Sequence, residues 1–263
     1  MPKSRIQDYL ERFSNQMIRF NPYTTKKMGL LQSQTLLKVE DYMLICAPYQ
    51  MSMNKVILLV ILSREEITFF QQFQKKITSL SLTFQKHGTK VPMNLFLRGT
   101  LERLGPVKGR ANVCMLEIAY KNCPTDLIEI IGDFIVAYQS LKSQYETFKD
   151  RSVEMNHESA QVMRFNDYAE LLVGAQKIEV KLTSLSVNRL VLEAPDSAQG
   201  LADGQKLVVK LYFQIYQFAA GGEVTRQEEA GPGTKRIHLV IDFAPELVEI
   251  LDDYFFRMSF KRE

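Results

Sequence analysis

The sequence predicts a mainly β protein with helices, an α+β fold in which two six-stranded antiparallel β-barrels are joined by a helix and a linker. Three observations lead to this fold class. Short runs in which apolar and polar residues alternate, as in half-buried strands, recur on both sides of one long helical pattern. Glycine and aspartate turns separate these runs. Because closure into a barrel removes exposed strand edges, many short antiparallel strands favour that architecture.

The composition is consistent with two modest domains in 263 residues. With 33 basic and 30 acidic residues the net charge is +3, so no overall field attracts nucleic acid, and none is expected as a partner. Cys46, Cys114 and Cys123 lack the spacing of metal ligands and are expected to be buried thiols, with no metal or cofactor. The longest apolar run, 56–62, is too short to span a membrane, and no secretion signal opens the chain, so a cytoplasmic location is expected.

Residues 1–28 are expected to form an N-terminal helical arm. Between residues 4 and 20, apolar side chains recur at helical spacing: Ile6, Leu10, Phe13, Met17 and Phe20. Asn21-Pro22 then predicts the end of this helix, because proline disfavours helical backbone in the residue before it. We interpret the arm as a helix that packs on its own domain, in preference to one that docks on a partner.

Residues 29–149 predict the first barrel together with the long helix that ends it. Strands are expected at 35–37, 41–47, 55–62, 80–84, 93–104 and 112–119. A helix interrupts them, since Ser63 and Glu66 have the spacing of a capping box. Its apolar stripe is expected to consist of Phe69, Phe73, Ile77 and Leu80.

The clearest helical period in the chain begins after Pro124 and Thr125. Apolar side chains then alternate at spacings of four and three, as in a heptad repeat: Leu127, Ile131, Phe134, Tyr138, Leu141, Tyr145 and Phe148. Gly132 costs the helix about 1 kcal/mol relative to alanine, so packing must hold it. Two interpretations stay open: a helix that crosses a barrel mouth or joins two domains, and a homodimeric coiled coil. A monomer or weak dimer is expected.

Residues 150–163 are polar and without a period, and we interpret them as the interdomain linker. Residues 164–263 predict the second barrel. Strands are expected at 167–173, 177–183, 190–192, 207–218, 223–226 and 235–243, with a turn at Gly221-Gly222. Ala244-Pro245 begins a final helix, whose apolar stripe consists of Leu247, Ile250, Leu251, Tyr254 and Phe255.

Two short patterns mark the beginning of the second barrel. Arg164 stands directly before its first strand, and Ser184-Leu185-Ser186-Val187-Asn188-Arg189 follows its second. Together they resemble the motifs of the PilZ family, small bacterial barrels that bind cyclic di-GMP through Arg-x-x-x-Arg and a following Asp/Asn-x-Ser-x-x-Gly. Arg164 matches the second arginine and Ser186 the serine, whereas Ala160 stands in place of the first arginine.

The other two positions of the second motif depart from the family pattern. Ser184 replaces the acid, and a neutral hydroxyl accepts more weakly from guanine N–H groups than a carboxylate does. Arg189 replaces the glycine, and its long side chain either blocks the site or restores a missing guanidinium. Without the resemblance, the same residues read as a strand cap, a turn hydroxyl and a solvated hairpin tip.

The contribution of an arginine at such a site to the binding free energy of this ligand can be estimated. Its planar fork pairs with phosphate or with guanine O6 and N7, and it stacks on ring faces. One charged hydrogen bond contributes about 1.5–3 kcal/mol, so losing the first arginine weakens binding about ten- to hundredfold.

The resemblance extends over both halves of the chain. The N-terminal part of the chain, which contains Lys26-Lys27-Met28-Gly29-Leu30, is similar to the domain that precedes PilZ in proteins of flagellar-brake type. It implies a non-enzymatic adaptor in cyclic di-GMP signalling that affects motility, with nucleotide binding weakened or lost. The implied ligand site lies where linker and second barrel meet. Its candidate residues are Arg164, Ser184, Ser186, Asn188, Arg189 and Arg151.

Two other functions compete with this one. An enzyme is not expected, because His87, His157 and His238 are scattered and no catalytic motif accompanies them. The alternative is a ligand-independent interaction module, in which the heptad-like helix, the N-terminal arm or the barrel surface holds a flagellar or other partner.

Overall fold

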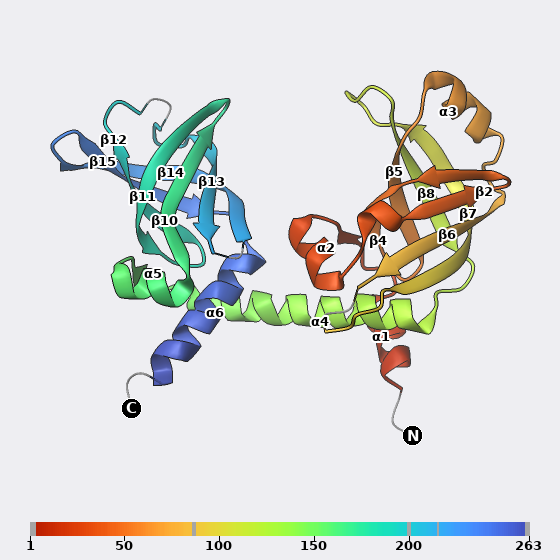
Figure 1. Ribbon diagram of the computed structural model, residues 1–263, viewed down its shortest axis with the longest axis horizontal. Helices are drawn as coiled ribbons and strands as arrows, with labels where there is room; N and C mark the ends of the chain where they lie inside the picture. The colour runs from red at the N-terminus through yellow and green to blue at the C-terminus, as the bar shows by residue number, and fades with distance from the viewer. Residues whose placement is uncertain (1–3, 86–87, 199–200, 215, 261–263) are drawn as a thin grey trace. The chain divides into compact units, whose positions relative to one another are not determined.

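The computed structural model describes residues 4–85, 88–198, 201–214 and 216–260, so His87 lies outside the described residues. The chain divides into two compact units, Met1–Ala137 and Tyr138–Glu263 (Figure 1). Each unit is built on an antiparallel β-sheet, and the predicted fold class, mainly β with helices, is confirmed. No helix among the described residues is long and apolar enough to cross a membrane.

The second unit is a closed barrel of six strands, as the sequence predicts. The strands are β10 (Phe165–Val173), β11 (Gln176–Leu185), β12 (Arg189–Pro195), β13 (Lys206–Phe213), β14 (Tyr216–Gly231) and β15 (Thr234–Ile241). They follow the order β10-β13-β14-β15-β12-β11, and pairing of β10 with β11 closes the ring. Helix α6 (Pro245–Phe260) packs Leu247, Val248 and Leu251 into the barrel core, at the end of the barrel where α5 (His157–Met163) also lies (Figure 1).

A seventh strand, β9 (Val153–Glu154), lies outside the ring but pairs with it. β10 pairs with residues 176–180 of β11, whereas β9 pairs with Ser184 and Leu185 farther along the same strand. β9 therefore occupies the edge of β11 where β10 has turned away. This pairing brings the segment before the barrel against the Ser184–Arg189 turn.

The stretch 150–163, interpreted from the sequence as the interdomain linker, contains the two short elements β9 and α5. Asn156 caps α5, because its side-chain oxygen accepts from the Ser159 N–H at 2.9 Å. The Ser159 hydroxyl in turn accepts from the Asn156 N–H at 2.8 Å and donates to the Glu154 carbonyl at 2.8 Å. These capping bonds stabilise two elements too short and too polar to show a period in the sequence.

The predicted turn at Gly221-Gly222 is wrong, because both glycines lie inside the long strand β14. The strand expected at 207–218 is instead two strands, because β13 ends at Phe213, Gln214 lies in a turn and β14 begins at Tyr216. A Cβ on Gly222 would stand only 3.0 Å from the Val240 carbonyl oxygen. The glycine thus permits the close approach of a neighbouring strand, which is the other common reason for glycine in a β pattern.

In the first unit one bent strand joins the two ends of the sheet. The sheet has the order β1-β4-β5-β8-β7-β6-β2-β3. Its strands are β1 (Ile18–Arg19), β2 (Leu36–Val39), β3 (Tyr42–Ile45), β4 (Ala47–Met51), β5 (Lys55–Ile61), β6 (Ile77–Phe84), β7 (Met93–Pro106) and β8 (Val113–Tyr120). Only Cys46 separates β3 from β4, and its N–H donates to the Thr35 carbonyl at 3.1 Å. Counted as one strand, β3–β4 completes a set of six to which β1 is added.

The N-terminal arm is two helices where one was expected. Helix α1 (Arg5–Phe13) ends well before residue 20, and α2 (Pro22–Met28) follows β1. Asn21 does not end a helix but begins one, since its side chain accepts from the Thr24 N–H at 2.8 Å. Proline is favoured at the first helical position. Asn21-Pro22 therefore marks the start of a helix, and the prediction that a helix ends there is wrong.

The helix predicted after β5 begins where the sequence indicates but ends earlier than expected. The Ser63–Glu66 capping box is confirmed, with the Ser63 N–H donating to Glu66 Oε2 at 2.7 Å. Helix α3 (Arg64–Gln71) then stops, and Ile77 and Leu80 belong to β6. The expected stripe failed there because residues spaced by four continue a helical pattern even where the chain has become a strand.

The long helix α4 (Thr125–Phe148) is confirmed; it begins in the first unit and ends in the second. Its heptad-like side chains are used inside the units. Leu127 and Ile131 are fully buried in the first core, and Phe148 is buried in the second. Tyr145 packs edge-on against Phe243, with ring centroids 5.1 Å apart. At these positions the heptad-like side chains pack within the chain itself.

Gly132, the weak point of the α4 pattern, is the contact point for α1. A Cβ built on Gly132 would overlap the ring of Tyr9. The Tyr9 hydroxyl donates to Asp133 Oδ1 at 2.7 Å and accepts from Arg5 Nε at 2.9 Å, and Arg5 also forms an ion pair with Asp133. The absence of a side chain at 132 lets the aromatic ring lie directly on the helix backbone.

Glu170 on β10 is a covered carboxylate with three donors. It accepts from the hydroxyls of Tyr168 at 2.5 Å and Tyr212 at 2.8 Å, and it pairs with Lys177. The bond with Lys177, followed by that with Tyr168, lowers the pKa of Glu170 from 4.5 to about 2. Three strands of the barrel are thereby tied on its outer face.

This cluster predicts a pH dependence of stability. A carboxylate whose pKa falls on folding stabilises the folded state above its unfolded pKa, and the contribution is lost as pH falls through the folded value. Thermal unfolding should therefore show stability declining from about pH 4.5 toward about pH 2, partly through Glu170. Glu170→Gln should have a lower Tm at pH 7 and a flatter decline over that range. An unchanged decline would show that other carboxylates account for it.

Candidate ligand-binding site

The Ser184–Arg189 motif forms the tight connection between β11 and β12. The Ser186 N–H donates to the Arg189 carbonyl at 2.9 Å, and the Ser186 hydroxyl accepts from the Arg189 N–H at 2.9 Å. The same hydroxyl lies 3.0 Å from Asn188 Oδ1, to which it donates. Ser186 is buried, so its hydroxyl holds the turn and positions Arg189 at the first place in β12.

Arg189 extends from this turn with an exposed side chain. Its backbone is not among those with positive φ in the described chain, so the conformation does not require glycine there. The replacement of glycine by arginine therefore introduces a guanidinium without straining the turn.

Four of the six predicted residues, Arg151, Ser184, Ser186 and Arg189, line one cavity of about 330 Å³. We call it the basic cavity; its full lining is Lys149, Asp150, Arg151, Ser152, Ser184, Ser186, Arg189, Val191 and His238. Three permanent cations face one carboxylate, that of Asp150. An enclosure with this charge balance favours an anionic ligand.

His238 and Val191 enter the cavity through strand pairing. Ser184 lies opposite Val191, and Val191 lies opposite His238, so the three form a row across β11, β12 and β15. His238 Nε2 lies 3.3 Å from Glu228 Oε1, and this hydrogen bond is the first cause of the lowered pKa of Glu228. Glu228 therefore holds the imidazole in place beside the cavity.

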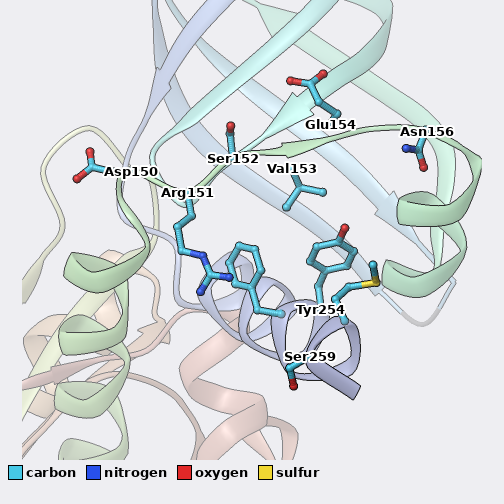
Figure 2. A pocket seen from close by; sticks show the side chains of 10 residues that line it. Asp150, Arg151, Ser152, Val153, Glu154, Asn156, Tyr254 and Ser259 are labelled. Carbon is cyan, nitrogen blue, oxygen red and sulfur yellow. The ribbon is translucent and has the colours of Figure 1, made fainter. Parts of the chain in front are cut away.

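Arg151 lies between two cavities. Its guanidinium carbon stands 3.5 Å from the ring centroid of Phe255 and 5.5 Å from that of Phe148. On this side it lines a cavity of about 630 Å³, which we call the α6 cavity (Figure 2). The cavity is enclosed by the segment 150–156 and by Tyr254, Phe255, Met258 and Ser259 of α6. A cation–π contact thus holds the arginine that the basic cavity shares.

Arg164 is not brought to the basic cavity. It ends α5 in the left-handed region, with φ 57°, and turns the chain into β10. Its carbonyl accepts from the Gln214 N–H at 2.9 Å. It lines a different cavity, of about 200 Å³, beside Glu249, Asp253 and Arg257 of α6. The sequence shows that Arg164 directly precedes a strand, but it does not show at which end of the barrel Arg164 lies.

Asn188 does not line the basic cavity but contacts it through Ser186. Five lining residues were not predicted from the sequence: Lys149, Asp150, Ser152, Val191 and His238. Lys149 had a local signal, because it stands two residues before Arg151 in a basic stretch. Val191 and His238 had none, since only the register of β12 and β15 puts them beside Ser184. Among the described residues no cluster of His, Cys, Asp or Glu could hold a metal ion.

Comparison with known proteins gives a family and a set of distant structures. The model of the PilZN3 domain matches residues 4–138, and no curated protein matches the sequence. The crystal structure of the Borreliella burgdorferi PlzA protein in complex with cyclic di-GMP is 12% identical, with a TM-score of 0.46 over 95% of this chain and 98% of that one. The Bacillus subtilis inhibitor of motility MotI is 11% identical, with a TM-score of 0.33 over 87% and 97%.

Proposed function

The chain belongs to the PilZN3 domain family, and from this premise we propose that it is a non-enzymatic adaptor in bacterial cyclic di-GMP signalling. It would bind the nucleotide weakly at the basic cavity of its second unit and pass the bound state on to a protein partner that affects motility. Family membership and the PilZ-like serine motif support the ligand class.

One observation carries the proposal: Arg151 and Arg189 reach the same cavity as both motif serines. A cavity of about 330 Å³ falls in the range of small-molecule sites. Two guanidinium forks and Lys149 supply the charge-assisted donors that a phosphate requires. Arg189, at the position of the missing glycine, would serve as the second arginine.

The same geometry accounts for weak binding. Arg151 is engaged with Phe255, and withdrawing a cation from an aromatic face costs about 0.5–2 kcal/mol. Ser186 is already saturated by its own turn and has little capacity left for a ligand. Arg164, which the resemblance places in the site, lies elsewhere. Each of these reduces the affinity relative to a site with both arginines free and converging.

Calorimetric titration of the full chain with cyclic di-GMP tests the proposal. Arg189→Ala should raise Kd about ten- to hundredfold, because one charged hydrogen-bonding partner is removed. Arg164→Ala is the matched control and should leave Kd unchanged. No heat and no thermal shift with the wild-type chain at high ligand concentration would refute nucleotide binding. An equal loss in the Arg164 variant would refute the basic cavity as its location.

Two of the three surfaces that a ligand-independent module could use, the N-terminal arm and the long helix, pack part of their apolar side chains within the chain itself. Tyr9 and Phe13 of the arm are buried, as are Leu127 and Ile131 of the long helix. Leu141 is partly buried and packs on the core of the second unit. These faces stabilise the chain itself, so we do not assign them to a partner.

A further inference from the structure

The family motif has an acid at the position of Ser184, and the structure places a different acid beside it. Strand β9 pairs with β11 so that Glu154 lies directly opposite Ser184, and Val153 opposite Leu185. Directly opposed residues of antiparallel strands carry their side chains on the same face, with Cβ atoms about 4.5–5.5 Å apart. Glu154 therefore shares the face of the motif serine.

The alternation along β9 fixes the direction of this side chain. Val153 is buried and Glu154 is exposed. Figure 2 shows the side chains of Ser152 and Glu154 on one side of this segment, and those of Arg151 and Val153 on the other, toward α6. Glu154 belongs to the lining of the α6 cavity, and its cross-strand partner Ser184 belongs to that of the basic cavity, so the pairing puts the Glu154 side chain next to a residue of the basic cavity.

The Glu154 carboxylate is not used by the fold. Among the described residues, no side-chain hydrogen bond or ion pair engages its oxygens; only its backbone carbonyl is bonded, to the Ser159 hydroxyl. The cations nearest in the chain are otherwise occupied: Lys149 pairs with Glu146, and Arg151 lies on Phe255. Two acceptor oxygens are thus available beside the basic cavity. Because a carboxylate repels an anionic ligand, its presence there calls for a specific role.

We propose that Glu154 supplies the carboxylate that position 184 lacks and accepts from the N–H groups of a guanine base bound at the basic cavity. This rests on the proposed function. Guanine presents two adjacent donors, at N1 and N2, which match the two oxygens of a carboxylate. Adenine presents an acceptor at N1 beside one donor, so the same carboxylate opposes it. Glu154 would therefore set the choice of guanine over adenine, while the arginines bind phosphate.

The direction in which one substitution changes Kd for cyclic di-GMP distinguishes this role from a general effect of charge. Glu154→Gln removes a negative charge near a dianionic ligand, and charge alone predicts tighter binding. If Glu154 accepts from guanine, the same change should instead raise Kd for cyclic di-GMP about ten- to hundredfold. Glu179→Gln, on exposed β11 surface and lining neither cavity, is the matched control and should not raise Kd.

The experiment titrates cyclic di-GMP and cyclic di-AMP into wild type, Glu154→Gln, Glu179→Gln and the double variant Glu154→Gln/Ser184→Asp. We expect the double variant to regain affinity for cyclic di-GMP, and cyclic di-AMP to bind weakly throughout without loss in Glu154→Gln. Wild-type binding that Glu154→Gln leaves unchanged or strengthens overturns the role of Glu154 alone. Absence of wild-type binding overturns the proposed function as well.

Discussion

Replacing Gly29 by alanine is expected to destabilise the first unit by about 2–5 kcal/mol. Gly29 ends α2 with φ 71°, a left-handed conformation that costs any side-chain-bearing residue about 1–2 kcal/mol. The remainder comes from packing. The Gln85 N–H donates to the Gly29 carbonyl at 2.6 Å, and a Cβ on Gly29 would overlap the Gln85 carbonyl group. Backbone cannot move aside as a flexible side chain would.

Urea denaturation followed by far-ultraviolet circular dichroism measures this loss. Gly109→Ala is the matched control: its φ is +77°, but nothing lies within 4 Å of the added Cβ. It should lose only about 1–2 kcal/mol, the conformational part. Equal losses in the two variants would show that the approach of residue 85 to Gly29 contributes nothing.

Replacing Gly132 by leucine should displace α1 and lower the free energy of unfolding by about 3–5 kcal/mol, as when a large aromatic leaves a core. The added side chain would occupy the space of the Tyr9 ring. Tyr9 and Phe13, now 6% and 4% exposed, would lose their burial, and Asp133 would lose both of its partners in α1. Limited proteolysis should cleave α1 in the variant faster than in the wild type.

The matched control is Val136→Leu, one turn farther along α4, where the side chain is 41% exposed and the change should be nearly neutral. The mechanism itself is tested in a Tyr9→Ala background, where the ring is absent and the leucine has room. The further cost of Gly132→Leu should then be small, because residues in contact are energetically coupled. Additive costs for the two substitutions would contradict a direct contact between Tyr9 and Gly132.

Local signals in the sequence were sufficient for much of the fold. The Ser63–Glu66 capping box and the α4 period were correct because each depends on residues within a few turns of one helix. Asn21-Pro22 misled because the same pair both ends and begins helices. Strand alternation was enough to predict a closed second barrel, although Gly221-Gly222 was read as a turn.

The candidate site was only partly accessible from the sequence, because it depends on pairing between distant segments. Ser184, Ser186 and Arg189 belong to one turn, and their proximity was evident. Glu154 and Arg151 reach that turn only through a two-residue strand, which is too short to leave a pattern. Arg164 is nearer in sequence to the first barrel strand than Arg151 is, yet it lines another cavity, since α5 intervenes.

The single strand that serves as both β3 and β4 has a consequence for how the first unit comes apart. In an open sheet, terminal strands can fray one at a time, each at little expense to the rest. Here β3, the last strand in the order, and β4, which is followed at the other end only by the two-residue β1, belong to one piece of chain that bends at Cys46. Peeling β3 from β2 pulls on the residues that anchor β4 to β5. The unit is therefore expected to unfold in one cooperative step, without earlier separation of β3 or β4 from the sheet.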